Sequence, residues 1–128
     1  MRFIFLLLCT VIPIAAQTSE SYQYSKTSIS EEARYEITQS TLSAKSTFKL
    51  DKFTGRVWQM VRSKEDRPAW EEVPVIKAPK IAPGSNARFQ LFISGVAARF
   101  TYLLDTVSGQ TWVFVDDLHG LRAWEPID

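Results

Sequence analysis

The chain repeats itself at one constant spacing, and this duplication restricts the fold more than any other feature. Residues from Arg34 onward align without a gap with residues from Arg88 onward, an offset of 54 positions. Identical residues recur through the whole unit, in the pairs Ser40 and Ser94, Thr47 and Thr101, Leu50 and Leu104, Asp51 and Asp105, Gly55 and Gly109, Trp58 and Trp112, and Ala69-Trp70-Glu71 and Ala123-Trp124-Glu125. With 128 residues the chain has room for one domain, so we expect the two copies to share a core.

The repeat divides the chain into five predicted segments. We expect a signal peptide over residues 1–16, a disordered leader rich in Ser, Thr and Glu over 17–33, a β-repeat unit over 34–74, a proline-rich connector over 75–87 and a second β-repeat unit over 88–128. The alternative for the leader is an edge strand at Tyr22 and Tyr24. Because proline fixes φ and has no backbone N–H, the connector is predicted to be semi-rigid and not helical.

The first segment has the pattern of a secretory signal. Arg2 precedes an apolar run over residues 3–14, and small residues follow at Ala15 and Ala16. The run is shorter than the about 20 apolar residues that span a bilayer, so we expect no stable membrane span after the signal is removed. We predict a periplasmic or secreted protein. Its only cysteine, Cys9, would leave with the signal, which excludes thiol chemistry.

The charge balance excludes one class of partner. The chain has 15 basic and 14 acidic residues, and loss of Arg2 with the signal leaves 14 of each. Binding to nucleic acid depends on a concentrated basic surface. We therefore predict no nucleic-acid partner.

Alternating apolar residues predict that the chain is all-β, with two tandem four-stranded antiparallel units. In the first unit we assign to the apolar face Tyr35, Ile37, Phe48, Leu50, Trp58 and Met60. The opposite face is predicted to be wet and carries Glu36, Thr38, Lys49 and Gln59.

The second unit has apolar residues on both predicted faces. One face is assigned Phe89, Leu91, Ile93, Tyr102, Leu104, Trp112 and Phe114. The other carries Phe92, Leu103, Val113 and Val115, so we expect the second unit to be covered on both sides. The pattern leaves open whether the units pack as a compact sandwich or as two adjacent propeller-like blades.

Each unit contains a strong hairpin signal between its second and third strands. Asp51 is followed by Thr54 and Gly55, and Asp105 is followed by Ser108 and Gly109. Asp can bond the backbone two residues on, and Gly takes a positive φ, which together predict a type I turn closed by a glycine bulge. This turn gives Asp51, Gly55, Asp105 and Gly109 a structural role and no catalytic one.

The segments Leu50-Asp51-x-x-Thr54-Gly55-x-x-Trp58 and Leu104-Asp105-x-x-Ser108-Gly109-x-x-Trp112 resemble the blade motif of quinoprotein-type β-propellers. That resemblance implies four-stranded meanders. The quinoprotein pattern usually has three residues between Gly and Trp where this chain has two, and two units are fewer than a closed propeller needs, so no quinone is carried over and we predict no cofactor. Residues 34–128 also resemble small exported bacterial proteins with tandem copies of this unit and no known activity.

The candidate binding residues are four tryptophans, two glutamates and two arginines. Trp58 and Trp112 are predicted to pack in the core, with ligand stacking as the alternative. The pairs Trp70-Glu71 and Trp124-Glu125 either close their units or, if exposed, bind a sugar or a peptide. Arg34 and Arg88 are expected to pair with carboxylates within the protein, the alternative being a bound anion.

No residue set specifies a reaction. His119 lies in a polar loop with Gly120, which is typical of a hairpin and not of a metal site. No nucleophile elbow or phosphate-binding loop is present in the sequence. We predict a non-enzymatic exported binding or interaction module whose ligand is a carbohydrate or an envelope protein. The alternatives are a structural component that self-assembles as a homo-oligomer and, more remotely, a quinoprotein-like redox subunit.

Overall fold

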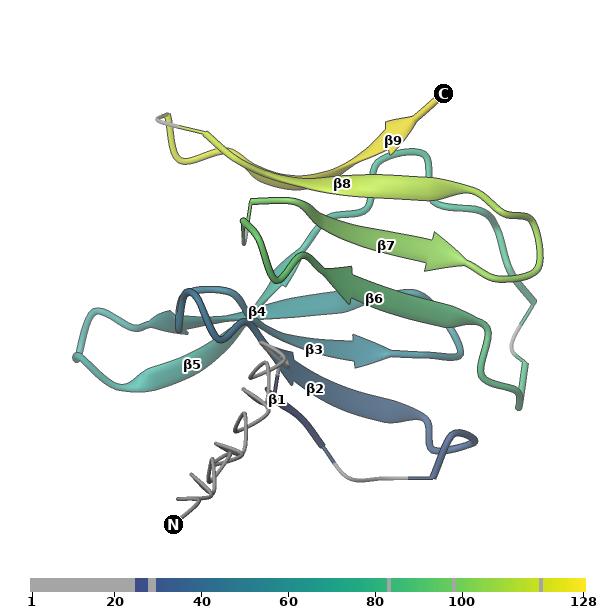
Figure 1. The fold of residues 1–128 in the computed structure, drawn as a ribbon, viewed down its shortest axis with the longest axis horizontal. Coiled ribbons are helices and arrows are strands. Elements are labelled where there is room, and N and C mark those ends of the chain that lie inside the picture. The colour runs from purple at the N-terminus through teal and green to yellow at the C-terminus, as the bar shows by residue number, and fades with distance from the viewer. Residues whose placement is uncertain (1–24, 28–29, 83, 98, 118) are drawn as a thin grey trace, which may run out of the picture.

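The computed structural model describes residues 25–27, 30–82, 84–97, 99–117 and 119–128, and in these ranges it contains strands and no helix (Figure 1). The N-terminal sheet has the order β1-β2-β3-β4-β5, with β1 (Ser25–Lys26), β2 (Tyr35–Gln39), β3 (Thr47–Asp51), β4 (Val57–Arg62) and β5 (Pro68–Val73). The C-terminal sheet has the order β6-β7-β8-β9, with β6 (Phe89–Ile93), β7 (Thr101–Asp105), β8 (Thr111–Asp116) and β9 (Arg122–Ile127). All pairs are antiparallel, which confirms two tandem four-stranded units in an all-β chain.

The predicted hairpin turns are present between β3 and β4 and between β7 and β8. The N–H of Gly55 donates to the carbonyl oxygen of Asp51 at 2.8 Å, and the N–H of Gly109 donates to that of Asp105 at 2.8 Å. Both glycines have positive φ, 78° and 77°. The local chemistry of the two segments was therefore sufficient to predict these turns.

The N-terminal sheet gains a fifth strand from the segment that we predicted to be a disordered leader. β1 pairs with β2, and Lys26 forms an ion pair with Glu36 at 2.9 Å. Farther along, Lys52 donates to the carbonyl oxygen of Glu31 at 2.6 Å. These contacts tie residues of the leader to the sheet, unlike our expectation. The predicted signal peptide and residues 17–24 lie outside the described residues.

One core joins the two sheets, which pack face to face (Figure 1). Its buried members from the N-terminal sheet are Phe48, Leu50, Val57 and Val73. Its buried members from the C-terminal sheet are Phe89, Ile93, Leu103, Trp112 and Trp124. At its centre the Phe48 ring lies 5.1 Å from the Phe114 ring and 5.6 Å from the Trp124 ring, in edge-to-face contacts.

The two repeat units contribute opposite faces to this core. We call residues 54 positions apart repeat-equivalent. Trp112 and Trp124 are fully buried in the core, whereas their repeat-equivalents Trp58 and Trp70 belong to the outer face of the N-terminal sheet. The units are thus stacked in the same sense, as successive members of a row. A two-fold sandwich would bury the same face of both units.

This stacking corrects the facing that we predicted for the first unit. Tyr35, Ile37, Trp58 and Met60 were expected in the core but belong to the outer face, whereas Glu36, Thr38 and Gln59 were expected to be wet but point inward and are buried. On β3 the prediction was correct, because Phe48 and Leu50 are in the core and Lys49 is on the outer face. The buried polar groups are satisfied. The Thr38 hydroxyl donates to Glu36 at 3.2 Å, and the Gln59 amide donates to the carbonyl oxygen of Lys45 at 3.0 Å. Because partners offset the cost of burying these groups, polarity alone gave the wrong face.

The facing of β7 also differs from the prediction. Leu103 points into the core, and Tyr102 and Leu104 lie on the outer face of the C-terminal sheet. That outer face was expected to be covered, but Phe92 is 58% exposed. The assignments of Phe89, Leu91, Ile93, Trp112 and Phe114 to the core side were correct.

The connector runs beside the last strand. The N–H of Trp124 donates to the carbonyl oxygen of Pro74, and the N–H of Ile76 donates to that of Trp124, both at 2.9 Å. Val75 thereby forms a parallel bridge with Trp124. In addition, the indole Nε1 of Trp112 donates to the carbonyl oxygen of Ile76 at 2.8 Å.

Candidate functional site

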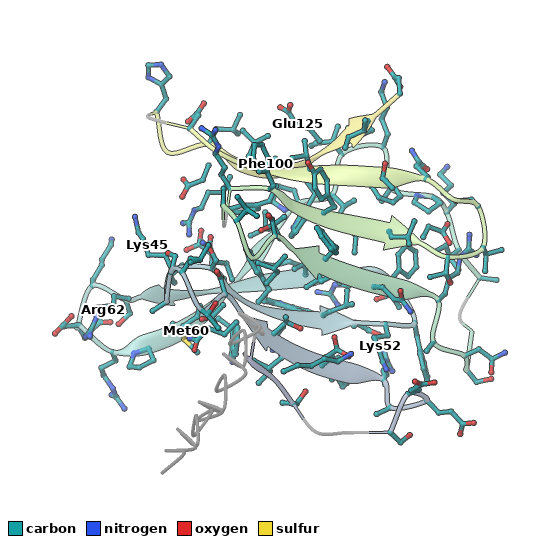
Figure 2. The ribbon with its side chains drawn as sticks, in the orientation of Figure 1. Lys45, Lys52, Met60, Arg62, Phe100 and Glu125 are labelled. Carbon is teal, nitrogen blue, oxygen red and sulfur yellow. The ribbon has the colours of Figure 1, made fainter. Side chains whose placement is uncertain are left out.

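The outer face of the N-terminal sheet is the strongest candidate for a binding surface. We call it the tryptophan face, and its members are Tyr35, Ile37, Lys49, Trp58, Met60 and Trp70. Cross-strand pairing makes Lys49 a direct neighbour of Trp58, and Met60 a direct neighbour of Trp70. The backbone pairing thus assembles one surface from four strands, and Figure 2 shows Met60 at its position on β4.

The tryptophan face is mostly apolar and partly exposed. Tyr35 is 49% exposed and Ile37 is 38% exposed, while the other members are half-buried. Aromatic side chains that are left partly exposed on a flat strand surface supply a large contact area with little conformational freedom to lose. The face can therefore bind a flat apolar or aromatic group.

Two cations are placed on the indole rings. The Lys49 ammonium lies 4.5 Å from the Trp58 ring centroid and 5.2 Å from that of Trp70, and the Arg56 guanidinium lies 4.9 Å from the Trp58 ring. Arg56 is itself held by Glu72, with two donor–acceptor distances of 2.8 and 2.6 Å. The cations shield the rings from water, and they give the face a positive side chain at its centre.

The structure separates the two predicted Trp-Glu pairs. Trp70 lies on the tryptophan face, but the Glu71 carboxylate accepts from Arg122 of the other sheet at 2.6 Å. Trp124 is fully buried, and its indole Nε1 has no hydrogen-bond partner among the described residues. Trp124 therefore packs in the core and has no surface for a ligand. Glu125, the next residue of β9, is exposed on the outer side of the C-terminal sheet (Figure 2). The two tryptophans do not form a repeated site.

Arg34 and Arg88 bind carboxylates of their own units. Arg88 Nε and Nη2 each donate to Asp105 at 2.7 Å, and Arg34 Nη2 donates to Asp51 at 2.8 Å. Both carboxylates are almost fully buried, at 0% and 2% exposed. Two-pronged contacts of this kind are specific and strong. Each arginine thus links the start of the first strand of its unit to the aspartate of the hairpin turn, so the expected carboxylate partner lies within the protein.

These contacts lower the pKa of both turn aspartates. Hydrogen bonds from Arg88, from the Ser108 hydroxyl and from the Val107 N–H hold the pKa of Asp105 far below its usual range, against the opposing effect of burial. Burial alone would raise the pKa of Asp51, but the hydrogen bonds from Arg34 and from its own turn outweigh that effect and lower it. Both groups stay ionised at neutral pH.

We expect the free energy of unfolding to fall as the pH drops below about 4. Above that pH Asp105 is ionised in both states and its stabilisation is complete. As the pH falls towards its lower folded pKa, the unfolded state takes up protons first and the stabilisation is lost. Urea midpoints from pH 7 to pH 2 measure this loss. Asp105→Asn should give a shallower decline than the wild type, and Asp66→Asn, an exposed control, should leave it unchanged. If the urea midpoint of Asp105→Asn fell with pH as steeply as that of the wild type, the lowered pKa of Asp105 would not be the cause of the decline.

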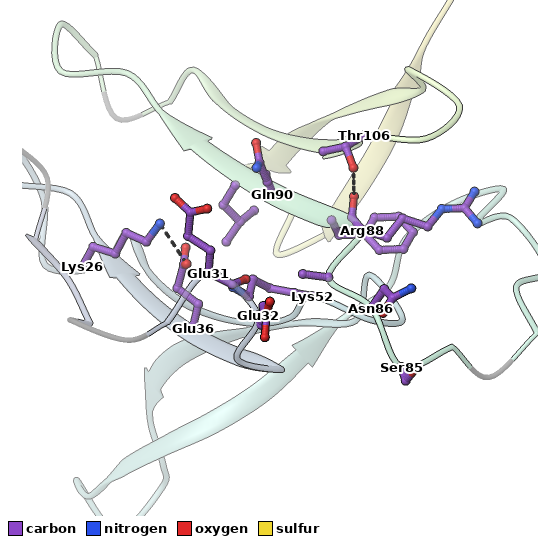
Figure 3. A pocket seen from close by; sticks show the side chains of 13 residues that line it. Lys26, Glu31, Glu32, Glu36, Lys52, Ser85, Asn86, Arg88, Gln90 and Thr106 are labelled. Atoms are coloured by element: carbon purple, nitrogen blue, oxygen red, sulfur yellow. Dashed lines mark hydrogen bonds and ion pairs between the residues drawn. The ribbon is translucent and has the colours of Figure 1, made fainter.

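A second candidate is a polar cleft of about 660 Å³ where β2, the start of β6 and the connector meet (Figure 3). Four of its charged members already have partners, whereas the carboxylates of Glu31 and Glu32 line the cleft without a partner among the described residues. Glu36 pairs with Lys26, Lys52 donates to a backbone carbonyl, and Arg88 is held by Asp105. The tryptophan face is the better candidate, because its partly exposed aromatic side chains offer a larger apolar contact area than this polar cleft.

The described residues contain no group of three or more His, Cys, Asp or Glu side chains placed to hold a metal ion. His119 is exposed, and its N–H donates to Asp117 within the β8–β9 turn at 2.9 Å. Within the same part of the chain no helix is long and apolar enough to cross a membrane.

Sequence reasoning missed Lys49 as a site residue. Its repeat-equivalent is the buried Leu103, and this difference between the two copies was the available signal.

Comparison of the chain with protein-family models, with curated proteins and with solved structures found no match.

Proposed function

We propose that this protein is an exported, non-enzymatic interaction module that binds another polypeptide through the tryptophan face. One observation carries the proposal. Trp58 and Trp70 lie on an outer sheet face, although their repeat-equivalents Trp112 and Trp124 are fully buried against a neighbouring sheet. A surface of this composition gains stability when it is covered, because apolar area leaves water.

The chemistry of the face describes the partner. Aromatic and aliphatic side chains favour an apolar surface, and the central Lys49 favours a partner with a carboxylate near the middle of the contact. Tyr35 and Ile37, the most exposed members, would lie under the partner as well. An envelope protein with such a patch fits this description.

We expect Trp58→Ala combined with Trp70→Ala to abolish partner binding with a small effect on folding. The affinity should fall at least about tenfold for each indole lost, because aromatic residues at the centre of a contact contribute most of its energy. Crosslinking and pull-down from an envelope extract, with recovery quantified by mass spectrometry, measure the loss. Lys64→Ala combined with Glu65→Ala, in the exposed β4–β5 turn, is the matched control.

The proposal fails if the double tryptophan variant recovers the same partners as the control variant. A folded variant is verified by its circular dichroism spectrum and urea midpoint.

A carbohydrate is the second candidate ligand, favoured by the two neighbouring indoles on a flat surface. A glycan array separates the candidates. Binding of a glycan that requires Trp58 and Trp70, in the absence of any polypeptide partner, would replace the polypeptide proposal with a carbohydrate-binding one.

A further inference from the structure

The outer face of the C-terminal sheet is a second apolar surface that no described strand covers. We call it the rear face, and its members are Phe92, Tyr102, Leu104, Val113, Val115, Glu125 and Ile127. Phe92 is 58% and Ile127 is 43% exposed, and the Phe92 and Tyr102 rings pair at 6.2 Å. The molecule thus has one apolar face at each end of its two-sheet stack.

The rear face is the repeat-equivalent of a surface that is already in a contact. Tyr102, Leu104 and Ile127 correspond to Phe48, Leu50 and Val73, which the N-terminal sheet buries against the C-terminal sheet. On the other side of that contact lie Phe89, Trp112 and Trp124, whose repeat-equivalents Tyr35, Trp58 and Trp70 form the tryptophan face. The two free faces are therefore copies of the two halves of the existing interface.

We propose that copies of this protein associate head-to-tail, with the tryptophan face of one copy covering the rear face of the next. The inference rests on the proposed function and names a second copy of the chain as the partner. The contact repeats between chains the stacking that the two units have within a chain. An interface between unlike faces leaves one of each free, so association continues until a ring closes or a filament grows.

The charges of the two faces match this arrangement. The tryptophan face has Lys49 at its centre, whereas the charged member of the rear face is the exposed carboxylate Glu125. Within the chain, Glu71, the repeat-equivalent of Glu125, already crosses to the other sheet and binds Arg122 at 2.6 Å. A carboxylate at this position is thus used once in a contact between sheets. The repeat-equivalent of Arg122 is Pro68, so in a contact between copies Glu125 would pair with a different cation, and Lys49 is the one at the centre of the tryptophan face.

Lys49 also sets the strength of the association. Its repeat-equivalent Leu103 is fully buried in the contact within the chain. Covering an ammonium group costs more than covering a leucine, and the long lysine side chain lessens that cost by reaching towards the rim. We therefore expect the contact between copies to be weaker than the one within the chain, and to depend on concentration.

The experiment uses two variants that each block one face. Ile37→Glu places a charge on the tryptophan face and Phe92→Glu places one on the rear face, both at exposed positions. The circular dichroism spectrum and urea midpoint verify that each variant is folded. The protein is produced from its complete sequence, and its processed N-terminus is read by mass spectrometry. Sedimentation velocity and light scattering then follow the mass over a wide range of concentration.

We expect the wild type to form assemblies larger than a dimer as its concentration rises. Each variant alone should stay monomeric, and an equal mixture of the two should form a one-to-one dimer and nothing larger, because each supplies the face that the other lacks. Val107→Glu, at a 73% exposed position in the β7–β8 turn, is the control and should assemble as the wild type does.

Three outcomes would overturn the inference. They are a wild type that stays monomeric throughout, a variant that still associates with itself, and a mixture that gives no dimer. If the wild type stays monomeric while partner recovery still requires Trp58 and Trp70, the proposed function stands and the inference falls. If self-association requires Phe92 but not Ile37, and if Trp58 and Trp70 are dispensable for every partner, the proposed function and the head-to-tail inference are both wrong.

Discussion

Replacing Trp112 with alanine is expected to destabilise the protein by about 3–5 kcal/mol, whereas replacing its repeat-equivalent Trp58 is expected to cost less than about 1 kcal/mol. Trp112 is fully buried in the core, so the truncation leaves a cavity between the sheets. It also removes the donor to the carbonyl oxygen of Ile76. Trp58 is only half-buried on the outer face of its sheet, so its loss leaves no cavity between the two sheets.

Urea denaturation followed by far-ultraviolet circular dichroism gives both free energies without relying on the tryptophan signal. The two substitutions are chemically identical and differ only in where the stack places the residue, so each is the control for the other. A domain of this size has a total stability of about 5–15 kcal/mol, and Trp112→Ala therefore consumes a large share of it. Equal losses at the two positions would contradict the same-sense stacking of the units.

The second large effect is expected at Gly55. Its φ of 78° is costly for any side chain, and a Cβ at this position would lie 2.8 Å from the Phe89 ring, which is part of the core. We expect Gly55→Ala to lose about 2–5 kcal/mol, of which about 1–2 come from the left-handed backbone and the rest from overpacking. Gly55→Ala tests the contact between the sheets directly.

Gly109 provides the matched control for this substitution. It has nearly the same φ, 77°, and the same place in the hairpin of its unit, but a Cβ there meets nothing within 4 Å. Gly109→Ala should therefore lose only the backbone cost, about 1–2 kcal/mol. The difference between the two midpoints isolates the Phe89 contact, and no difference would mean that Phe89 does not lie against Gly55.

The sequence was a good guide wherever the cause is local. The turn at Gly55 follows from the conformational freedom of glycine and from a neighbouring aspartate, both within one short segment. The division into two all-β units follows from the repeat and from strand periodicity. None of these features depends on a distant residue.

The facing of the first unit depends on distant residues, and there the prediction failed. Glu36 is buried because Lys26 of the preceding segment pairs with it, and Gln59 is buried because Arg122 of the last strand donates to it at 3.2 Å. Neither partner can be read from the alternation in the strand. A hydrophobic pattern assigns a face by polarity, whereas burial is decided by whether the polar group finds a partner.

The candidate site was predicted in part. Trp70 belongs to the tryptophan face as one of the proposed binding residues, but Trp124 does not, although the two are repeat-equivalent. A repeat suggests equal roles, yet the first unit is at an end of the stack, where no described strand packs against its outer face. In the sequence, this end of the stack is indicated by Lys49, which stands where the second unit has the buried Leu103.

The connector has a consequence for how strands of different molecules meet. The outermost strand of a sheet exposes a row of backbone donors and acceptors, which is a template for strands of other chains and a route to fibrous aggregates. On β9 the carbonyl oxygen and N–H of Trp124 are already taken by Ile76 and Pro74. A foreign strand would have to displace the protein's own connector at this point, which protects the C-terminal sheet from uncontrolled growth through its backbone.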